Sequence, residues 1–502
     1  MQRLFFLLAV LCLCAGAVSA HAAPLNVCLV SGSFEYKSDE ALGIFKAWLE
    51  KNCDVNCTLL SASGWDNIPG LEALDTCDVA LFFTRRLELK GEQLDRIKKY
   101  CDSGKPLVAV RTASHGFQKW LAFDREVLGG NYKGHFDEGP TIETFVMPDG
   151  KEHPILKDVE PFRSRYSLYK NPDISKDATV LLMGRTPESG GREPIAWTRV
   201  HNGGRVFYTS LGGVGDFENS AFARMVANAL FWTADRPVLL KELPGASARV
   251  RKPGTLHLAL RTRAAAATDG ASGEAVLRDW AAAETAIIIC DMWDKHWCDF
   301  ATAGVDALAP KINDLVRQAR AAGVQIIHCP SETLGFYQDS VQRRRMQAAP
   351  PAELPALKEI EEPPLPIHDR DGGCPGSEKF YMAWTRQHVA IEIADEDGMS
   401  DNGRDVYNYF RQNGIQNVLY VGVHTNMCVL GRSFGIRQMT RWGLNCALVR
   451  DLTDTMYNPA YPPKVSHDEG TELVVEHIEQ YWCPSITSAE LVAGLPDAIK
   501  EK

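Results

Sequence analysis

Residues 417–429 read Asn417-Val-Leu-Tyr-Val421-Gly-Val-His424-Thr-Asn-Met-Cys428-Val429, and this stretch decides the expected fold of the second half of the chain. Its first five residues form an apolar run, which predicts a short buried strand. The next segment, Leu430 to Trp442, has apolar residues at helical spacing. A strand, a tight turn and a helix would place Cys428 at a helix N-terminus, where unpaired N–H groups and the dipole favour a thiolate. The stretch therefore predicts a nucleophilic cysteine.

A second apolar run supplies a carboxylate for that cysteine. Residues 285–290 read Thr-Ala-Ile-Ile-Ile-Cys and lead directly into Asp291. A carboxylate at a strand end could accept the thiol proton. The two runs together predict a cysteine hydrolase in the C-terminal half.

Apolar runs alternate with amphipathic ones along both halves of the chain. In the first half we expect strands at 26–30, 78–83, 106–110 and 204–209, and helices at 39–51, 90–101 and 221–232. In the second half we expect strands at 285–290, 324–328, 389–393, 417–421 and 445–449, and helices at 305–322, 402–413, 430–442 and 468–481. This alternation predicts an α/β fold class with two three-layer domains and mostly parallel sheets.

The expected domain organisation follows from breaks in that pattern. We expect domains at 24–236 and 276–490, separated by a linker at 237–275 that is rich in proline, glycine and alanine. The excursion from Pro330 to His388 is rich in proline and too long for a simple loop, so we expect a lid or an oligomer contact there. A homo-oligomer formed through the C-terminal domain is one expected partner.

Composition narrows the range of other partners. The 502 residues carry a formal charge of −10, and no basic tract follows a pattern suited to phosphates. We therefore expect a small-molecule substrate and no nucleic acid. No cofactor is expected either.

The N-terminus predicts export. Arg3, an apolar stretch from Leu4 to Val18 and the small residues that follow are typical of a secretory signal peptide covering 1–22. No later run has the length of a membrane span, so we expect a periplasmic or extracellular protein. In such a compartment Cys53 and Cys57 form a plausible disulfide, whereas cysteines inside apolar strands are expected to be free and buried.

The C-terminal half resembles the isochorismatase-like cysteine hydrolases, a family that includes nicotinamidases and N-carbamoyl amidases. The resemblance covers about 276–490 and depends on Asp291 and on Gly-x-x-Thr-Asn-x-Cys-Val at 422–429. It implies Cys428 as nucleophile, Asp291 as base and a cis peptide between Val423 and His424. That turn, continued by Thr425, would direct the N–H groups of His424 and Cys428 to an oxyanion. The implied reaction is acyl transfer from an amide to sulfur, followed by hydrolysis.

Two features depart from that family. The catalytic lysine is absent at the expected strand end, which instead carries acidic residues at 395–397. Another residue could take the role of this lysine, and the candidates are Lys295, His296, Lys379, Arg386 and His388. The Asp-x-His metal pair of nicotinamidases is also absent, because the chain has His328-Cys-Pro-Ser-Glu332 there, so no metal is expected. Candidates for the substrate pocket are Trp293, Asp294, His296 and Asn426, with Trp297 as a further aromatic residue and His467 expected to cap or pack against a helix.

The N-terminal half resembles the ThuA-like (trehalose-utilisation) domain, a relative of class I glutamine amidotransferases with a flavodoxin-like sheet. Segments 106–115, 129–135, 153–155 and 204–212 carry the resemblance. The elbow after the third strand, Arg111 to Ser114, lacks the amidotransferase cysteine, so glutaminase chemistry is not expected. Arg111, Ser114, His115 and His135 are the candidate ligand site, and His115 and His135 with Asp137 or Glu138 could hold a metal.

Three functions remain open from the sequence. The first is an exported hydrolase that cleaves a small amide or related C–N bond through Cys428, beside a domain that binds or processes a carbohydrate-related ligand. The second is a non-catalytic binding or scaffold protein, which the missing lysine and elbow cysteine favour. The third is an enzyme that uses Asp291 alone as an acid.

Overall fold

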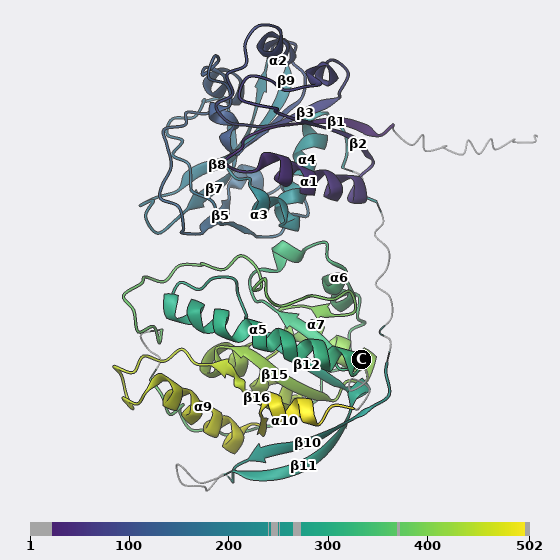
Figure 1. The fold of residues 1–502 in the computed structure, drawn as a ribbon, viewed down its shortest axis with the longest axis vertical. Helices are drawn as coiled ribbons and strands as arrows, with labels where there is room; N and C mark the ends of the chain where they lie inside the picture. The colour runs from purple at the N-terminus through teal and green to yellow at the C-terminus, as the bar shows by residue number, and fades with distance from the viewer. Residues whose placement is uncertain are drawn as a thin grey trace, which may run out of the picture.

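The computed structural model describes residues 23–238, 240–241, 249, 251–264, 273–368 and 372–496. Two α/β units follow one another along the chain, each built on its own sheet (Figure 1). The expected signal peptide at 1–22 lies outside the described residues. No helix among the residues described is long and apolar enough to cross a membrane.

The first unit contains a sheet of nine strands within the described part of the chain. Its order is β2 (Val55–Ser61), β1 (Leu25–Gly32), β3 (Val79–Thr84), β4 (Leu107–Val110), β9 (Gly204–Thr209), β8 (Glu193–His201), β7 (Thr179–Arg185), β5 (Ile142–Val146) and β6 (Arg163–Ser164). The strands from β2 to β9 are parallel, as expected for a flavodoxin-like order. The strands beyond β9 are antiparallel, a feature that the alternating pattern did not predict.

Helices cover both faces of this sheet because alternate strand residues point to opposite sides. Val27 and Leu29 of β1 pack with α1 (Ser38–Asn52), α3 (Val214–Phe217) and α4 (Ser220–Thr233). Cys28 and Val30 of the same strand pack with α2 (Glu92–Asp102) on the other side. Asn219 begins α4, where its side chain accepts from the N–H groups of Ala221 and Phe222.

The second unit contains a sheet of eight strands among the residues described. Its order is β11 (Glu274–Ala281), β10 (Thr255–Thr262), β17 (Ser485–Ile486), β16 (Asn445–Asp454), β15 (Asn417–Val423), β12 (Thr285–Cys290), β13 (Gln325–Cys329) and β14 (Gly398–Met399). The strands from β17 to β14 are parallel, and β10 and β11 form an antiparallel pair at one edge. Both units are therefore α/β, as the sequence predicts.

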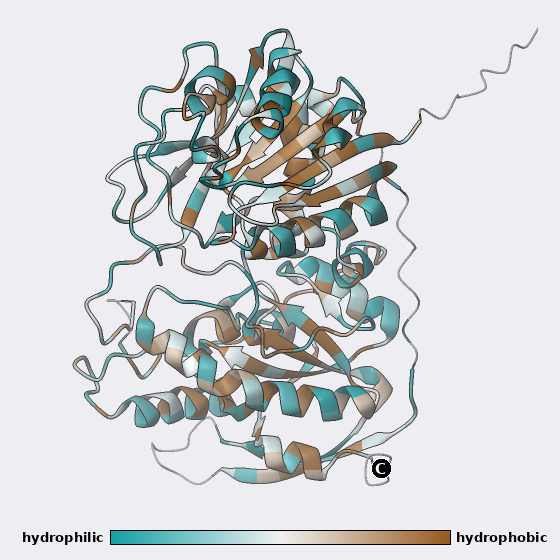
Figure 2. Cartoon of the chain, turned by 45° about the horizontal axis from the view of Figure 1, so that its top comes forward, coloured by the Kyte–Doolittle hydropathy of each residue, from teal (hydrophilic) through white to brown (hydrophobic). Residues whose placement is uncertain are grey.

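This sheet is also covered on two faces. Ile287 and Ile289 of β12 pack with α5 (Asp299–Ala321) and α10 (Ser488–Ala493). Ile288 packs with α7 (Gly403–Asn413), α8 (Ile436–Arg441) and α9 (His467–Tyr481). A further helix, α6 (Val341–Gln347), lies within the excursion that follows β13. Figure 2 shows the apolar strands in brown, inside the layers of helices.

Two expected elements need correction. Residues 389–393 form turns rather than a strand, since Val389 is exposed and the strand that pairs with β13 is instead β14. The helix expected at 430–442 is interrupted. A π-helical turn, Thr425–Val429, carries the cysteine, and α8 begins only at Ile436 after a break that ends at Gly435.

The linker expected at 237–275 is also shorter than predicted. Residues Thr255–Thr262 form β10, which pairs with β11 across the whole strand, from Thr255 opposite Ala281 to Thr262 opposite Glu274. Leu256, Leu258 and Leu260 are buried against the second unit. The apolar alternation of these residues outweighs the turn-forming composition around them.

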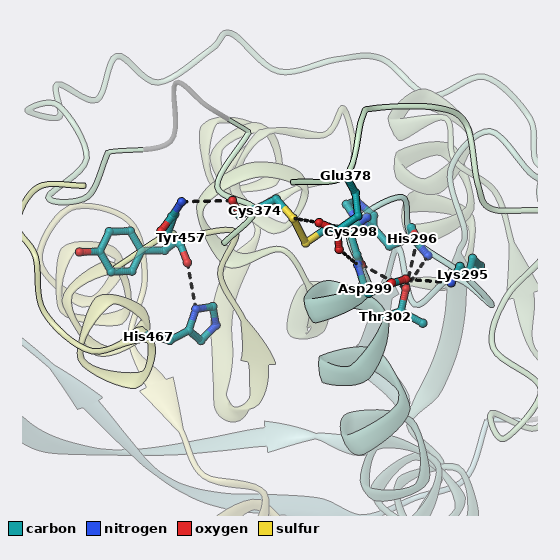
Figure 3. The surroundings of a disulfide bond; sticks show 10 residues. Lys295, His296, Cys298, Asp299, Thr302, Cys374, Glu378, Tyr457 and His467 are labelled. Atoms are coloured by element: carbon teal, nitrogen blue, oxygen red, sulfur yellow. Dashed lines mark hydrogen bonds and ion pairs between the residues drawn. A yellow bond between two sulfur atoms is a disulfide. The ribbon is translucent and has the colours of Figure 1, made fainter. Parts of the chain in front are cut away.

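The disulfide lies where the sequence did not place it. Cys53 and Cys57 are both free, whereas Cys298 and Cys374 are bonded, with their Cα atoms 5.9 Å apart and a sequence separation of 76. Figure 3 shows this bond joining the start of α5 to the excursion, with Glu378 beside it. The excursion is thus tied covalently to the unit that it covers.

Candidate active site

Cys428 lies on the π-helical turn that follows β15. The peptide between Val423 and His424 is cis, as the family resemblance implies. The backbone of His424 hydrogen-bonds to the Cys428 thiol and favours its ionised form. The turn therefore places the sulfur next to a backbone N–H group at the end of the sheet.

Asp291 reaches Cys428 because β12 and β15 are neighbours. Cys290 is paired with Gly422, and a Cβ on Gly422 would lie 2.1 Å from the carbonyl oxygen of Cys290, so only glycine permits this approach. Asp291 is fully buried, and its Oδ1 accepts from the N–H of Ser331 at 2.8 Å. A side-chain hydrogen bond between Asp291 and Cys428 affects the pKa of both groups. The carboxylate and the thiol therefore lie close enough for each to shift the pKa of the other.

Arg432 is the cation of this site, and the sequence analysis missed it. Its Nε donates to Asp291 Oδ2 at 2.9 Å, and its Nη1 lies 3.8 Å from Glu332 Oε1. It follows Cys428 by four residues, and its N–H donates to the Cys428 carbonyl, so both side chains lie on one side of the turn. That i, i+4 spacing was the signal available in the sequence.

Four of the five expected substitutes for the family lysine are engaged elsewhere, and the fifth, His296, lines the cavity beside Cys428. Lys295 pairs with Asp299, His388 with Asp306 and Arg386 with Glu218. Lys379 lies with Arg185 at a different cavity. Of the acidic run, Asp397 faces Arg320 and His328 rather than the thiol. The cation is therefore supplied from the helical turn of the cysteine itself.

The thiol is not held as a thiolate, contrary to the expectation from a helix N-terminus. Burial, followed by the nearby Asp291 charge, raises the pKa of Cys428 to about 12, although Arg432 opposes that rise. The turn has only five residues, so the dipole of a long helix is absent. Burial also raises the pKa of Asp291, which makes this carboxylate a stronger base. The geometry suits proton transfer from thiol to carboxylate during attack.

A cavity of about 300 Å³ opens onto these groups. Its polar members are His296, Glu332, His424 and Arg432 beside Cys428, and its apolar walls are formed by Trp293, Trp297, Gly372, Phe380, Met382, Trp384, Met427 and Met456. Burial lowers the pKa of His296 to about 3 and that of His424 to about 4, so both imidazoles are neutral near pH 7. The buried His424 Nε2 has no hydrogen-bond partner within the described part of the chain. His424 therefore has a buried, unpaired ring nitrogen beside a largely aromatic cavity.

Other predicted residues lie near the cavity without lining it. The Thr425 hydroxyl meets Thr453 at 2.7 Å, and Asn426 bonds to both backbone groups of Met456. Asp294 accepts from Thr385 and pairs with Arg165. His467 is the first residue of α9 and pairs with Asp454 at 2.8 Å. These side chains hold the segments around the cavity in place.

The residues of the candidate ligand site in the first unit do not form a single accessible group, because Arg111 is buried. Arg111, which follows β4 with φ of 50°, is the elbow residue, but its side chain is fully buried. Its guanidinium lies 4.7 Å from the ring centroids of Tyr36 and Tyr169 and donates to the carbonyls of Ser167 and Ser210. Arg111 is therefore occupied with protein groups, and the elbow carries no nucleophile.

His115 and His135 both lie beside Tyr169, since the ring centroids of His115 and Tyr169 are 6.1 Å apart and His135 pairs with Tyr169 in an isolated β-bridge. His115 stacks on Tyr132 at 4.5 Å, its Nδ1 meets the Ser114 hydroxyl at 3.1 Å, and burial, followed by the charges of Arg85 and Arg86, lowers its pKa to about 3. They do not form a three-ligand group with Asp137 or Glu138 in the described ranges. The group that does come together is Cys298, Cys374 and Glu378, whose two sulfurs are already bonded to each other.

The fold and the site define a two-unit α/β protein with a Cys–Asp–Arg group in its second unit, in which Asp291 is buried and Cys428 and Arg432 are half-buried. Residues 26–233 match the ThuA family model, described as trehalose utilisation, which confirms the N-terminal resemblance over less than half of the chain. No curated protein sequence matches the chain.

Solved structures of both resembled kinds are among the neighbours. A ThuA-like protein of Parabacteroides merdae is 16% identical, with 44% of this chain and 94% of that chain covered and a TM-score of 0.37. A cysteine hydrolase of Pseudomonas syringae pv. phaseolicola is 18% identical, with 43% and 93% covered and a TM-score of 0.30. An isochorismatase of Pseudomonas putida is 12% identical, with 42% and 91% covered and a TM-score of 0.26. Likenesses this distant carry no statement about activity.

Replacing Arg432 by glutamine is expected to raise the pKa of Cys428 further, because the guanidinium is the charge that opposes the rise. The rate of iodoacetamide labelling of Cys428 at about pH 9 should then fall by roughly tenfold for each unit of pKa. Arg432→Lys should restore part of the rate. Arg437→Gln is the control, since Arg437 pairs with Glu362 outside the cavity. An unchanged labelling profile in Arg432→Gln would show that the Arg432 charge does not act on the Cys428 thiol.

Proposed function

We propose that the second unit hydrolyses a small amide or a related C–N bond through a thioester on Cys428. The observation that carries the proposal is the position of Cys428 beside Asp291, which is itself paired with Arg432, at an aromatic cavity of about 300 Å³. Hydrolases of this kind need a nucleophile, a base that holds its proton and an apolar pocket for the acyl group.

In the first half-reaction, Asp291 accepts the thiol proton while the Cys428 sulfur attacks the carbonyl carbon. The carbonyl electron pair moves to oxygen and then returns as the C–N bond breaks. Protonated Asp291 gives its proton to the departing nitrogen, so ammonia or an amine leaves and a thioester remains. The raised pKa of Asp291 suits this exchange, because a carboxyl that is too acidic would neither accept nor return the proton.

In the second half-reaction, Asp291 accepts a proton from water while the water oxygen attacks the thioester carbon. The C–S bond breaks, the proton returns to sulfur, and a carboxylic acid is released. Arg432 balances the charge of the buried Asp291, which is the part that the family lysine would otherwise take. The N–H groups of His424 and Cys428 are our proposed oxyanion donors.

The first unit is proposed to bind a carbohydrate-related ligand near His115, His135 and Tyr132. This proposal is an analogy from the matched family, which is described as trehalose utilisation. We also propose export, which the Cys298–Cys374 disulfide supports because such bonds persist in oxidising compartments.

The direct test is a panel of small primary amides, N-carbamoyl compounds and substituted amides, assayed for ammonia or amine release. Acid quenching during turnover should trap an acyl adduct, and peptide mass spectrometry should place it on Cys428. Turnover with no adduct on Cys428, or with the adduct on another cysteine, would contradict the proposed nucleophile. Absence of turnover across the panel would favour the scaffold hypothesis.

A further inference from the structure

The first unit reaches into the wall of the cavity in the second unit. The excursion residues Ala383 and Trp384 lie against the edge strands of the first sheet, where Thr141 Oγ1 donates to the Ala383 carbonyl at 2.7 Å. Arg165 pairs with Asp294 at 3.2 Å, and Asp294 in turn binds Thr385. This part of the cavity wall is therefore held from the other unit.

Arg163 makes the most informative of these contacts. It lies on β6 at the sheet edge, and its Nη1 donates to the Glu332 carbonyl at 3.0 Å and to the Trp384 carbonyl at 3.3 Å. Its guanidinium also lies 5.9 Å from the centroid of the Trp384 ring. One side chain of the first unit thus joins two segments of the second unit that are 52 residues apart.

Both of those segments contribute to the cavity. Trp384 is 5% exposed and stacks on Trp293 with ring centroids 4.3 Å apart and an interplanar angle of 8°. Its Nε1 donates to Glu332 Oε2 at 3.1 Å. Glu332 faces Arg432 at 3.8 Å, and Arg432 binds Asp291. A continuous set of contacts therefore runs from Arg163 through Glu332 to Arg432 and the catalytic pair.

We propose that Arg163 is a positioning residue for the hydrolase site, so that the ThuA-like unit completes the active site of the other unit. The inference depends on the proposed function of that site. Arg163 fixes the Trp384 wall and the Glu332 backbone, and Glu332 in turn orients Arg432 beside Asp291. The two N–H groups of Arg163 Nη1 can serve both carbonyls at once, and the planar guanidinium also approaches the Trp384 ring, a contact that suits arginine better than lysine.

The alternative is that Arg163 merely holds the two units together. Arg224 provides a matched control, because it joins α4 to Asp339 of the second unit at 2.5 Å with both side chains largely buried. That ion pair crosses the same interface but touches none of the cavity residues. A variant of Arg224 therefore weakens the interface without loosening the Trp384 wall.

The test uses the full chain and amide hydrogen exchange of the peptides that cover 331–337 and 380–388. In Arg163→Ala, exchange in both peptides should accelerate about tenfold relative to the unaltered protein, because a hydrogen bond from a charged donor is lost at each segment. Arg224→Ala should leave both rates within about twofold. The exchange rates in Arg163→Lys should fall between those of Arg163→Ala and the unaltered protein. Thr141→Val is a milder change and should accelerate exchange only in the peptide that covers 380–388.

Labelling of Cys428 supplies a second readout at the site itself. We compare the rate at which bulky N-cyclohexylmaleimide labels Cys428 with the rate for iodoacetamide. Because the Trp384 side of the cavity loosens in Arg163→Ala, the ratio of the maleimide rate to the iodoacetamide rate should rise by about tenfold. Equal ratios in Arg163→Ala and the unaltered protein, or an equal change in Arg224→Ala, would overturn the proposal. Neither readout needs amide turnover, so failure of the hydrolase proposal and failure of this one are distinguishable.

Discussion

Replacing Cys428 by alanine is expected to lower amide turnover by about 10⁴-fold or more, the scale seen when a covalent nucleophile is removed. Cys428 is the only cysteine among the described residues that line the cavity, so no neighbouring side chain can form the thioester in its place. The measurement is the initial rate of ammonia or amine release with the best substrate of the panel. The adduct on the 428 peptide should vanish at the same time.

Cys57→Ala is the control for this change, because Cys57 is also a free, partly exposed cysteine but belongs to the first unit. Its turnover should equal that of the unaltered protein. Retention of most activity in Cys428→Ala would contradict thioester chemistry and would favour an enzyme that uses Asp291 alone as an acid. The result therefore separates two of the functions that the sequence left open.

Replacing Asp291 by asparagine should have two opposite effects. Turnover should fall by about 10³-fold, because no group remains to take the thiol proton and return it to nitrogen. The pKa of Cys428 should fall, since the Asp291 charge and its hydrogen bond both raise it and Arg432 is left to stabilise the thiolate. The midpoint of iodoacetamide labelling should thus move to lower pH as turnover is lost.

The opposition of the two effects is what makes this variant informative. Simple unfolding would expose the thiol and bring its pKa towards about 8.5, but it would also free the buried cysteines, such as Cys290 and Cys329, for labelling. Asp306→Asn is the control, because Asp306 is an exposed carboxylate that pairs with His388. If labelling in Asp291→Asn shifts to higher pH, Asp291 does not act on the thiol as proposed.

The local pattern was enough to predict the central parallel strands of both sheets and most of the α-helices. The buried runs at 285–290 and 417–421 became β12 and β15 because strands covered on both faces require apolar residues throughout. The two runs that end at Asp291 and precede Cys428 are neighbours in the sheet, so parallel pairing places both residues at one edge. The pairing of thiol and carboxylate was thus predictable from the order of the strands.

Other features depend on contacts between segments that are distant in sequence, so the local pattern could not predict them. The Cys298–Cys374 bond needs the excursion to fold back onto the start of α5. The raised pKa of Cys428 comes from burial, which cannot be assigned before the walls of the cavity are known. Arg163 and Trp384 are 221 residues apart and meet only where the two units touch.

The sequence by itself determined the two α/β units, the strand-end positions of Asp291 and Cys428, and the turn between Val423 and His424. Hydrophobic periodicity and the parallel connections suffice for the two units and the strand ends, since both act over a few neighbouring residues, whereas the turn between Val423 and His424 followed from the family resemblance. Only the tertiary structure decided the state of the thiol, the choice of Arg432 as its cation and the contribution of the first unit to the cavity. These depend on burial and on charge at distances of a few ångströms, which are properties of the packed chain rather than of any segment.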